Sequence, residues 1–221
     1  MKEFDELVGI VKKLRSPNGC PWDRAQKVSD TSKHLLEEVY ELIEGIDKSD
    51  PKLICEEIGD VMLLLVFLAQ IFSEKKKFHV QDAIRHISQK LIGRHPHVFS
   101  NTKVKDKHQV LENWIQAKAK IKKRKTVKER LPKSAPALLL AQIFFKELRY
   151  LDEKKFFQIQ DVLSPLPKTI KLLSEKLPQK QKEKLFTQAV FSLARAAFCY
   201  DIDLETLLRK EIFAVAKKKH Y

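Results

Sequence analysis

Apolar residues recur every three to four positions through most of this chain, and this spacing restricts the fold more than any other feature. Such a period places apolar side chains on one face of an α-helix, whereas a half-exposed strand needs strict alternation. No segment alternates convincingly. The five glycines are also scattered too widely to form a phosphate-cradling loop or a dinucleotide-binding turn. The sequence therefore predicts an all-α protein.

The composition indicates a soluble protein that is not anchored in a membrane. The chain has 221 residues, 43% of them hydrophobic and 33% charged, which suits one large domain or two small ones. The N-terminal stretch MKEFDELVGIVKKL is typical of an amphipathic helix rather than a signal peptide. The longest apolar run, 61–72, is shorter than the roughly 20 residues that a membrane span needs. The three cysteines form no CxxC pair, so we expect a cytoplasmic protein without a zinc site.

Turn-forming residues divide the first half of the chain into helices. Pro, Asn and Gly gather in the loop RSPNGCPWDRAQ, and the segment DKSDP separates two later apolar runs. A helix cap is expected near Ser29–Ser32. The predicted helices cover about 3–15, from that cap to 46, 52–73, 81–94, and a segment that begins near 105.

A strongly basic segment follows, in which residues 118–133 hold nine bases and one acid. We interpret it as a solvated helix end and linker, because no aromatic residues are interleaved for base stacking. The alternative is a nucleic-acid-binding helical protein that acts through this segment. The predicted organisation is a first helical domain over 1–118, a basic linker over 119–134 and a second helical domain over 135–221.

The second half repeats the helical pattern of the first, which suggests an internal duplication. When the two halves are overlaid, the acids of the first half are not matched in the second. Leu185 falls where Glu57 stands, and Gln188 falls where Asp60 stands.

Acidic residues gather between positions 37 and 60, although the whole chain has a net charge of +14. Glu38 and Glu41 are three residues apart, as are Glu57 and Asp60, so each pair lies on one side of its helix. Both pairs are equally distant from a turn near Ser49. In an antiparallel hairpin with a rise of 1.5 Å per residue, all four carboxylates are therefore expected at one level.

A salt-bridged surface would have Lys or Arg one turn away from these acids. Apolar residues or glycine stand there instead: Leu42, Gly45, Val61 and Leu64. Carboxylates at the edge of an apolar core need a counter-charge, and oxygen ligands without His or Cys favour Mg²⁺ or Mn²⁺. A solvated acidic surface stays open as an alternative. A di-iron bundle is disfavoured, because the expected Glu-x-x-His pairs are absent.

Four ordered motifs carry a resemblance to a known family. They are LLEEVYELIEGID…EEIGDVMLLLVF in the acidic hairpin, GCPWDRAQ (19–26), QKLIGRHPHVFSN (89–101) and ENWIQAKAK (112–120). They resemble the EExxE…ExxD, CPWDxxQ, KxxxRHPHVF and NWxxxK motifs of the MazG family of nucleoside triphosphate pyrophosphohydrolases. The resemblance covers residues 1 to about 120 nearly continuously.

The resemblance implies an all-α MazG-like helical bundle, usually homodimeric. It implies Mg²⁺-dependent hydrolysis of a nucleoside triphosphate to the monophosphate and pyrophosphate, a reaction that cleans the nucleotide pool, with Mn²⁺ as a possible substitute. By position in the motifs, the metal ligands are Glu38, Glu41, Glu57 and Asp60. The candidates for positioning or deprotonating the attacking water are Glu37, Glu41 and Glu56. The expected substrate contacts are Trp22, Lys90, Arg94, Trp114 and Lys118.

The outer residues are physically compatible with these roles. Lys90 and Arg94 lie one helical turn apart, so two cationic groups share a face that suits a triphosphate. Taken alone, Lys90 and Arg94 would form a solvated helix face, and Trp114 would be a core residue. The second half departs from the family. Where the resemblance places acids, it has Lys168 and Lys171 in addition to Leu185 and Gln188, so we expect it to be catalytically inactive.

Overall fold

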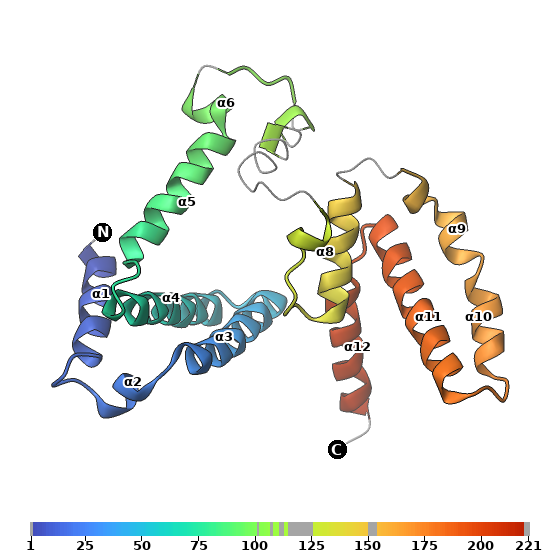
Figure 1. The fold of residues 1–221 in the computed structure, drawn as a ribbon, viewed down its shortest axis with the longest axis horizontal. Coiled ribbons are helices and arrows are strands. Elements are labelled where there is room, and N and C mark those ends of the chain that lie inside the picture. The colour runs from blue at the N-terminus through green and yellow to red at the C-terminus, as the bar shows by residue number, and fades with distance from the viewer. Residues whose placement is uncertain are drawn as a thin grey trace. The chain divides into compact units, whose positions relative to one another are not determined.

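The computed structural model describes residues 2–100, 102–106, 108–110, 113–114, 126–149 and 154–218. Within these ranges every regular element is a helix, which confirms the all-α class (Figure 1). The chain divides into two compact units, Met1–Lys107 and His108–Tyr221, and each is described here by itself. No helix in the described ranges is both long enough and apolar enough to cross a membrane.

The first unit contains the first four predicted helices within a few residues of their expected ends. The helix expected to begin near 105 falls in the second unit, where residues 108–110 and 113–114 are helical, and the rest of it lies outside the described residues. Its elements are α1 (Lys2–Leu14), α2 (Pro21–Ala25), α3 (Val28–Lys48), α4 (Pro51–Glu74), α5 (Val80–Arg94) and α6 (Pro96–Phe99). One difference is α2, a short helix where the sequence indicated only a loop. It begins at Pro21, whose fixed φ suits the first helical position.

Helices α3 and α4 form the antiparallel hairpin that the acidic pattern predicted. Ser49 ends α3 in the left-handed region with φ 53°, and Asp50 caps α4 by accepting hydrogen bonds from the backbone N–H groups of Lys52 and Leu53. Near this turn the helices approach closely, since a Cβ on Gly45 would lie 3.2 Å from Leu53 Cγ. The hairpin therefore has a tight, capped corner that fixes the register of its two arms.

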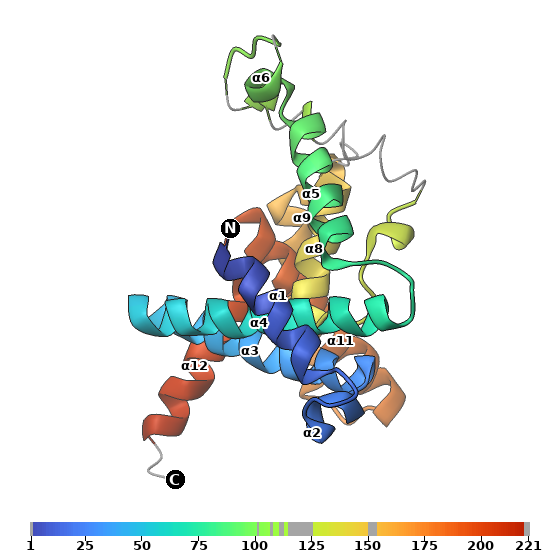
Figure 2. The same ribbon diagram turned by 90° about the vertical axis from the view of Figure 1, so that its left-hand side faces the viewer.

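Helix α1 packs against α4 and completes the core of the first unit (Figure 2). Val11 of α1 is fully buried and packs in one cluster with Val66, Phe67 and Ile71 of α4. Burying such side chains contributes about 1.5–3 kcal/mol each. This contact holds α1, and the loop that follows it, beside the C-terminal half of α4.

The loop between α1 and α2 folds back onto the end of α1. The backbone N–H of Cys20 donates to the carbonyl of Leu14 over 2.8 Å. A Cβ on Gly19 would lie only 2.2 Å from that same Leu14 oxygen. Only glycine fits this close approach of two backbone segments. The loop thereby brings α2 to the side of the hairpin.

The second unit is built around a cluster of phenylalanines. Phe145 is fully buried, and the centre of its ring lies 5.2–6.0 Å from the ring centres of Phe156, Phe191 and Phe198. The elements of this unit are η1 (Lys128–Arg130), α8 (Ala137–Arg149), η2 (Lys154–Phe157), α9 (Ile159–Leu163), α10 (Leu166–Leu173), α11 (Gln179–Cys199) and α12 (Leu204–Lys218).

An ion pair joins η1 to α8 in this unit. Arg130 Nη1 donates to Glu147 Oε2 over 3.0 Å, and the two side chains are only 19% and 8% exposed. Glu147 is one of three buried polar or charged residues in the described part of the chain. The segment that precedes α8 is thus held through a largely desolvated contact.

The same type of backbone turn ends a helix in each of the two units. After α4, Lys76 adopts φ 53° and the N–H of Lys77 donates to Phe72 O over 3.0 Å. After α11, Asp201 adopts φ 54° and the N–H of Ile202 donates to the carbonyl of Ala197 over 2.8 Å. Both are Schellman-type helix endings with a left-handed residue. A further helix follows each of them, α5 in one unit and α12 in the other.

Candidate metal centre and substrate pocket

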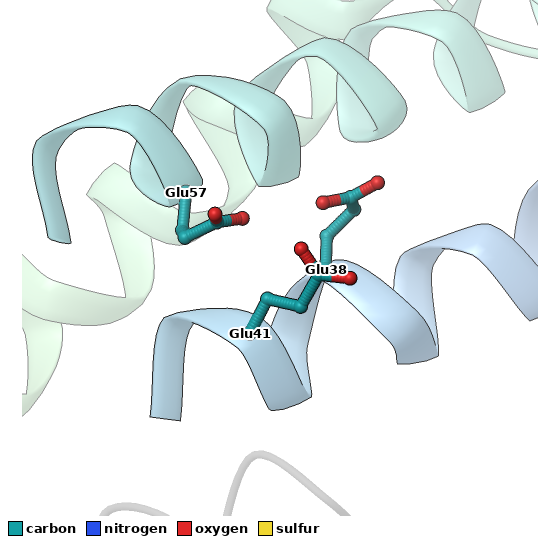
Figure 3. A group of neighbouring side chains, drawn as sticks. All are labelled: Glu38, Glu41 and Glu57. Carbon is teal, nitrogen blue, oxygen red and sulfur yellow. The ribbon is translucent and has the colours of Figure 1, made fainter. Parts of the chain in front are cut away.

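Three carboxylates converge across the α3–α4 hairpin. Glu38 and Glu41 extend from α3, and Glu57 extends toward them from α4 (Figure 3). One oxygen of each residue lies within 4.8 Å of an oxygen of the other two. Glu57 is 5% exposed, Glu38 is half-buried and Glu41 is exposed. The equal arms of the hairpin thus place acids from both helices at one level.

The electrostatics of this group are unfavourable in the absence of a cation. Burial raises the pKa of the Glu57 carboxyl above its usual value, and the negative charges of Glu41, Glu38 and Asp60 raise it further. Its Oε2 atom is buried and has no hydrogen-bond partner. None of the ion pairs found within the described ranges includes Glu38, Glu41 or Glu57. A buried anion without a counter-charge is costly, so the group is suited to hold a cation.

The donor set fits a hard divalent ion. It contains carboxylate oxygens alone, and such ligands favour Mg²⁺, Ca²⁺ or Mn²⁺ over softer metals. Ligand oxygens around Mg²⁺ lie about 2.0–2.1 Å from the ion, so opposite ligands are roughly 4.2 Å apart. The oxygens of Glu38, Glu41 and Glu57 lie within 4.8 Å of one another, a slightly wider spacing. The spacing of the three carboxylates is thus close to that of an Mg²⁺ ligand set.

The other predicted acids lie around this group rather than within it. Asp60 is half-buried and close enough for its charge to act on Glu57, but it is not among the three converging residues. Glu37 is exposed, and its Oε2 lies 3.0 Å from His34 Nδ1. Glu56 is also exposed.

A pocket of about 250 Å³ adjoins the carboxylates, with Glu38 in its wall. This volume is close to the lower end of the range of about 300–1,000 Å³ for small-molecule sites. The apolar part of its lining comes from α1 and α4, and α2 and α3 supply an indole and several polar groups. The lining residues are Leu14, Trp22, Asp23, Gln26, Thr31, His34, Glu38, Leu63, Leu64 and Phe67.

The predicted substrate residue Trp22 is therefore at the pocket, and it is 62% exposed. The sequence interpretation missed Thr31 and His34. A signal for them was present, because they precede Glu38 by seven and four residues and thus share its helix face. Asp23 and Gln26 belong to the CPWDxxQ-like segment but were given no role.

Of the remaining predicted contacts, only two can be placed relative to this pocket, and neither lines it. Lys90 and Arg94 are half-buried on α5 and line neither the pocket nor the carboxylate group. Trp114 is half-buried and falls in the second unit, so it is not placed relative to the hairpin. Lys118 lies outside the described residues, as does much of the basic segment 118–133.

The second unit holds no comparable acidic group among its described residues. Glu38, Glu41 and Glu57 are the one metal-compatible set of at least three His, Cys, Asp or Glu side chains found in the described ranges. Lys168, Lys171 and Gln188 are exposed, and Leu185 is half-buried.

Comparison with known proteins agrees with this geometry. Residues 26–99 match the model of the MazG nucleotide pyrophosphohydrolase domain, which covers both arms of the hairpin. The chain is 36% identical over 212 residues to the nucleoside triphosphate pyrophosphohydrolase/pyrophosphatase MazG of Thermotoga maritima; this alignment covers 94% of the chain and 80% of the relative.

Two further relatives are matched over a smaller share of their length. The nucleoside triphosphate pyrophosphohydrolase of Escherichia coli K12 is 37% identical over 146 residues, which are 64% of this chain and 56% of that protein. The uncharacterized protein YabN of Bacillus subtilis is 41% identical over 138 residues, which are 62% of this chain and 28% of that protein. The MazG domain match and the alignment along nearly the whole chain show that this protein belongs to the MazG family.

Proposed function

We propose that this protein is a metal-dependent nucleoside triphosphate pyrophosphohydrolase that releases a nucleoside monophosphate and pyrophosphate. The observation that carries this proposal is the buried, unpartnered Glu57 oxygen, which faces Glu38 and Glu41 beside a pocket. The printed names of the Thermotoga and Escherichia relatives support the same reaction. The acids alone would repel a triphosphate, so a cation between them is required.

Mg²⁺ is the proposed ion, with Mn²⁺ as a possible substitute. Glu38, Glu41 and Glu57 would hold it, with Asp60 completing the set from α4. When bound, such an ion polarises phosphoryl oxygens and lowers the pKa of a bound water. The protein's own contribution is the hairpin, which holds the carboxylates at fixed spacing before the substrate arrives.

Glu37, Glu41 and Glu56 are the proposed acceptors of the attacking water's proton, and Glu41 is the one of them that would also hold the ion. Glu41 is exposed and so can approach solvent, and Glu56 is exposed on the facing helix. Glu37 is held by His34 over 3.0 Å, which restricts its side chain. A carboxylate within hydrogen-bond reach of water is a competent general base.

The pocket is the proposed binding site for the nucleobase. Its apolar lining and the Trp22 indole suit a flat ring that can stack, while Glu38 connects the pocket to the carboxylate group. We propose that Lys90, Arg94, Trp114 and Lys118 also contact the substrate. Cationic groups near the leaving pyrophosphate would offset its developing charge.

The test is pyrophosphate release from a panel of nucleoside triphosphates, with Mg²⁺ and with EDTA. Glu38→Gln and Glu57→Gln are expected to lower the rate by about a hundredfold or more, because each removes a charged ligand. Glu44→Gln is the matched control, since Glu44 lies exposed on the same helix and pairs with Lys48. Pyrophosphate release by both ligand variants at the wild-type rate would refute the proposal.

A second measurement does not depend on activity. Mg²⁺ should raise the melting temperature of the wild-type protein by mass action but not that of Glu57→Gln. In EDTA the same variant should melt above wild type, because it removes a buried charge that faces like charges. If Mg²⁺ raised the melting temperature of Glu57→Gln as much as that of wild type, Glu57 would not be a ligand.

Three broader properties are also proposed. We expect a homodimer, because α4 exposes Ile58, Met62 and Leu65 on one face at 46%, 37% and 50%. Light scattering after gel filtration tests the dimer. We propose a cytoplasmic location, which suits three free cysteines. We propose that the second unit is catalytically inactive. The full chain with both Glu38→Gln and Glu57→Gln tests this, because any pyrophosphate that it still releases would have to come from the second unit.

A further inference from the structure

One arginine outside the carboxylate group contacts three parts of the first unit. Arg15 follows the last residue of α1, and its side chain is only 6% exposed. Its Nε and Nη2 atoms donate to the two carboxylate oxygens of Glu74 at the end of α4, each over 2.8 Å. Its Nη1 atom donates to the backbone carbonyls of Asp23 over 2.5 Å and Gln26 over 3.3 Å. Its guanidinium carbon lies 5.0 Å from the centre of the Phe67 ring.

These contacts join two parts of the pocket lining, one from the α2 segment and one from α4. Asp23 lies in α2 beside Trp22, Gln26 follows the last residue of α2, and Phe67 belongs to the α4 wall. Within the described ranges, the other hydrogen bonds of the α2 segment stay local, as in the bond from Arg24 Nη1 to Pro17 O. Arg15 is therefore the hydrogen-bonded bridge between α2 and α4.

The bridge needs the shape of arginine as well as its charge. A guanidinium carries five N–H donors in a planar fork, so it can serve a carboxylate on one edge and backbone carbonyls on the other. A lysine ammonium has no such second edge. Glu74 neutralises the buried cation and also accepts a hydrogen bond from Gln70 over 3.2 Å. The contact is thus a bidentate ion pair between a buried guanidinium and a carboxylate whose side chain is 36% exposed, and its two parallel hydrogen bonds make it directional.

We propose that Arg15 is a positioning residue for the nucleobase pocket, acting through the backbone carbonyls of Asp23 and Gln26 to hold the Trp22 wall at a fixed distance from α4. This inference rests on the proposed function. None of the contacts of Arg15 described above is with Glu38, Glu41 or Glu57. Its loss should therefore weaken binding of substrates that have a base and leave the chemical step nearly unchanged.

The test compares Arg15→Met and Arg15→Lys with wild type on two substrates. One is a nucleoside triphosphate, and the other is ribose 5-triphosphate, which keeps the sugar and phosphates but has no base. Arg85→Met is the matched control, because Arg85 pairs with Asp82 over 2.9 Å on the exposed face of α5. Steady-state kcat and KM are measured with Mg²⁺, and folding is checked by thermal melting.

For the nucleoside triphosphate, Arg15→Met is expected to raise KM by about tenfold to a hundredfold, because a misplaced pocket wall costs binding. Its kcat should stay within about twofold of wild type. For ribose 5-triphosphate, KM should not change. Arg15→Lys should show a smaller increase in KM, and Arg85→Met should show none. A role limited to stability would instead lower the active fraction, and hence kcat, on both substrates alike.

Each other outcome has a defined meaning. An unchanged KM for the nucleoside triphosphate in Arg15→Lys and Arg15→Met overturns the inference, as does an equal increase in KM on the substrate without a base. If Arg15→Met does not fold, Arg15→Lys alone decides by the same criterion. A wild-type protein that releases no pyrophosphate refutes the proposed function, and this inference is then wrong with it. Normal wild-type activity with unaffected Arg15 variants refutes the inference alone.

Discussion

Replacing Arg130 by Met should destabilise the second unit strongly, because it removes the guanidinium from a buried carboxylate. Glu147 is 6% exposed, so water cannot replace the lost partner without a structural change. Removing one member of a buried ion pair costs about 3–5 kcal/mol. The matched control is Lys48→Met, since the Lys48–Glu44 pair is more than half exposed on both sides. Breaking such a surface pair costs about 0–1 kcal/mol.

Urea unfolding at pH 7, followed by helical circular dichroism, measures both effects. With a slope of about 1–3 kcal/mol per molar urea, the loss of 3 kcal/mol lowers the midpoint by at least about 1 M. The double variant Arg130→Met/Glu147→Met should recover most of the loss, because two apolar side chains can replace a buried pair at little cost. If Arg130→Met costs no more than Lys48→Met, the pair is effectively solvated and the reasoning is wrong.

Three further predictions concern packing, backbone geometry and pH. Gly19→Ala should lower the free energy of unfolding by about 1–3 kcal/mol in thermal melts, because its Cβ meets the Leu14 carbonyl. Gly9 lies at an open position within α1, so Gly9→Ala should instead raise the free energy of unfolding by about 0.5–1 kcal/mol. Phe145→Ala should lower the free energy of unfolding by about 3–5 kcal/mol, and the 70% exposed Phe213 should tolerate the same change within about 0.5 kcal/mol. The hydrogen bond from Gln142 lowers the pKa of Asp203 below its ordinary value of 3.8. The ionised Asp203 carboxylate therefore stabilises the fold fully above pH 3.8, and this stabilisation is lost as the pH falls through the lowered pKa. Gln142→Leu should therefore reduce the drop in melting temperature between pH 5 and pH 3, and an unchanged drop would contradict this.

The acidic hairpin could be predicted from the sequence because its geometry follows from helical spacing. Two pairs of acids at equal distances from a turn must lie at similar levels, and the structure brings Glu38, Glu41 and Glu57 together. The helix ends were also predictable within a few residues, since Pro51 and Asp50 are strong start signals. The start of α3 was less accurate. The backbone N–H of Lys27 donates to Asp30, so the cap lies before the predicted serines.

The pocket could not be predicted in the same way, because its walls come from segments far apart in the chain. Spacing along one helix relates Thr31 and His34 to Glu38, but it does not show that α2 folds back beside them. That arrangement depends on the close backbone approach at Gly19 and on the contacts of Arg15. Likewise, spacing placed Asp60 level with Glu57, whereas the orientation of its side chain depends on packing.

The matching corners after α4 and α11 show how little this kind of helix ending depends on its side chain. Lysine stands at the left-handed position in one corner and aspartate in the other, and serine stands there after α3. None of these corners uses glycine, the residue that would adopt this backbone at least cost. The backbone N–H groups and carbonyls that close the corners therefore tolerate opposite charges at the same point of the turn.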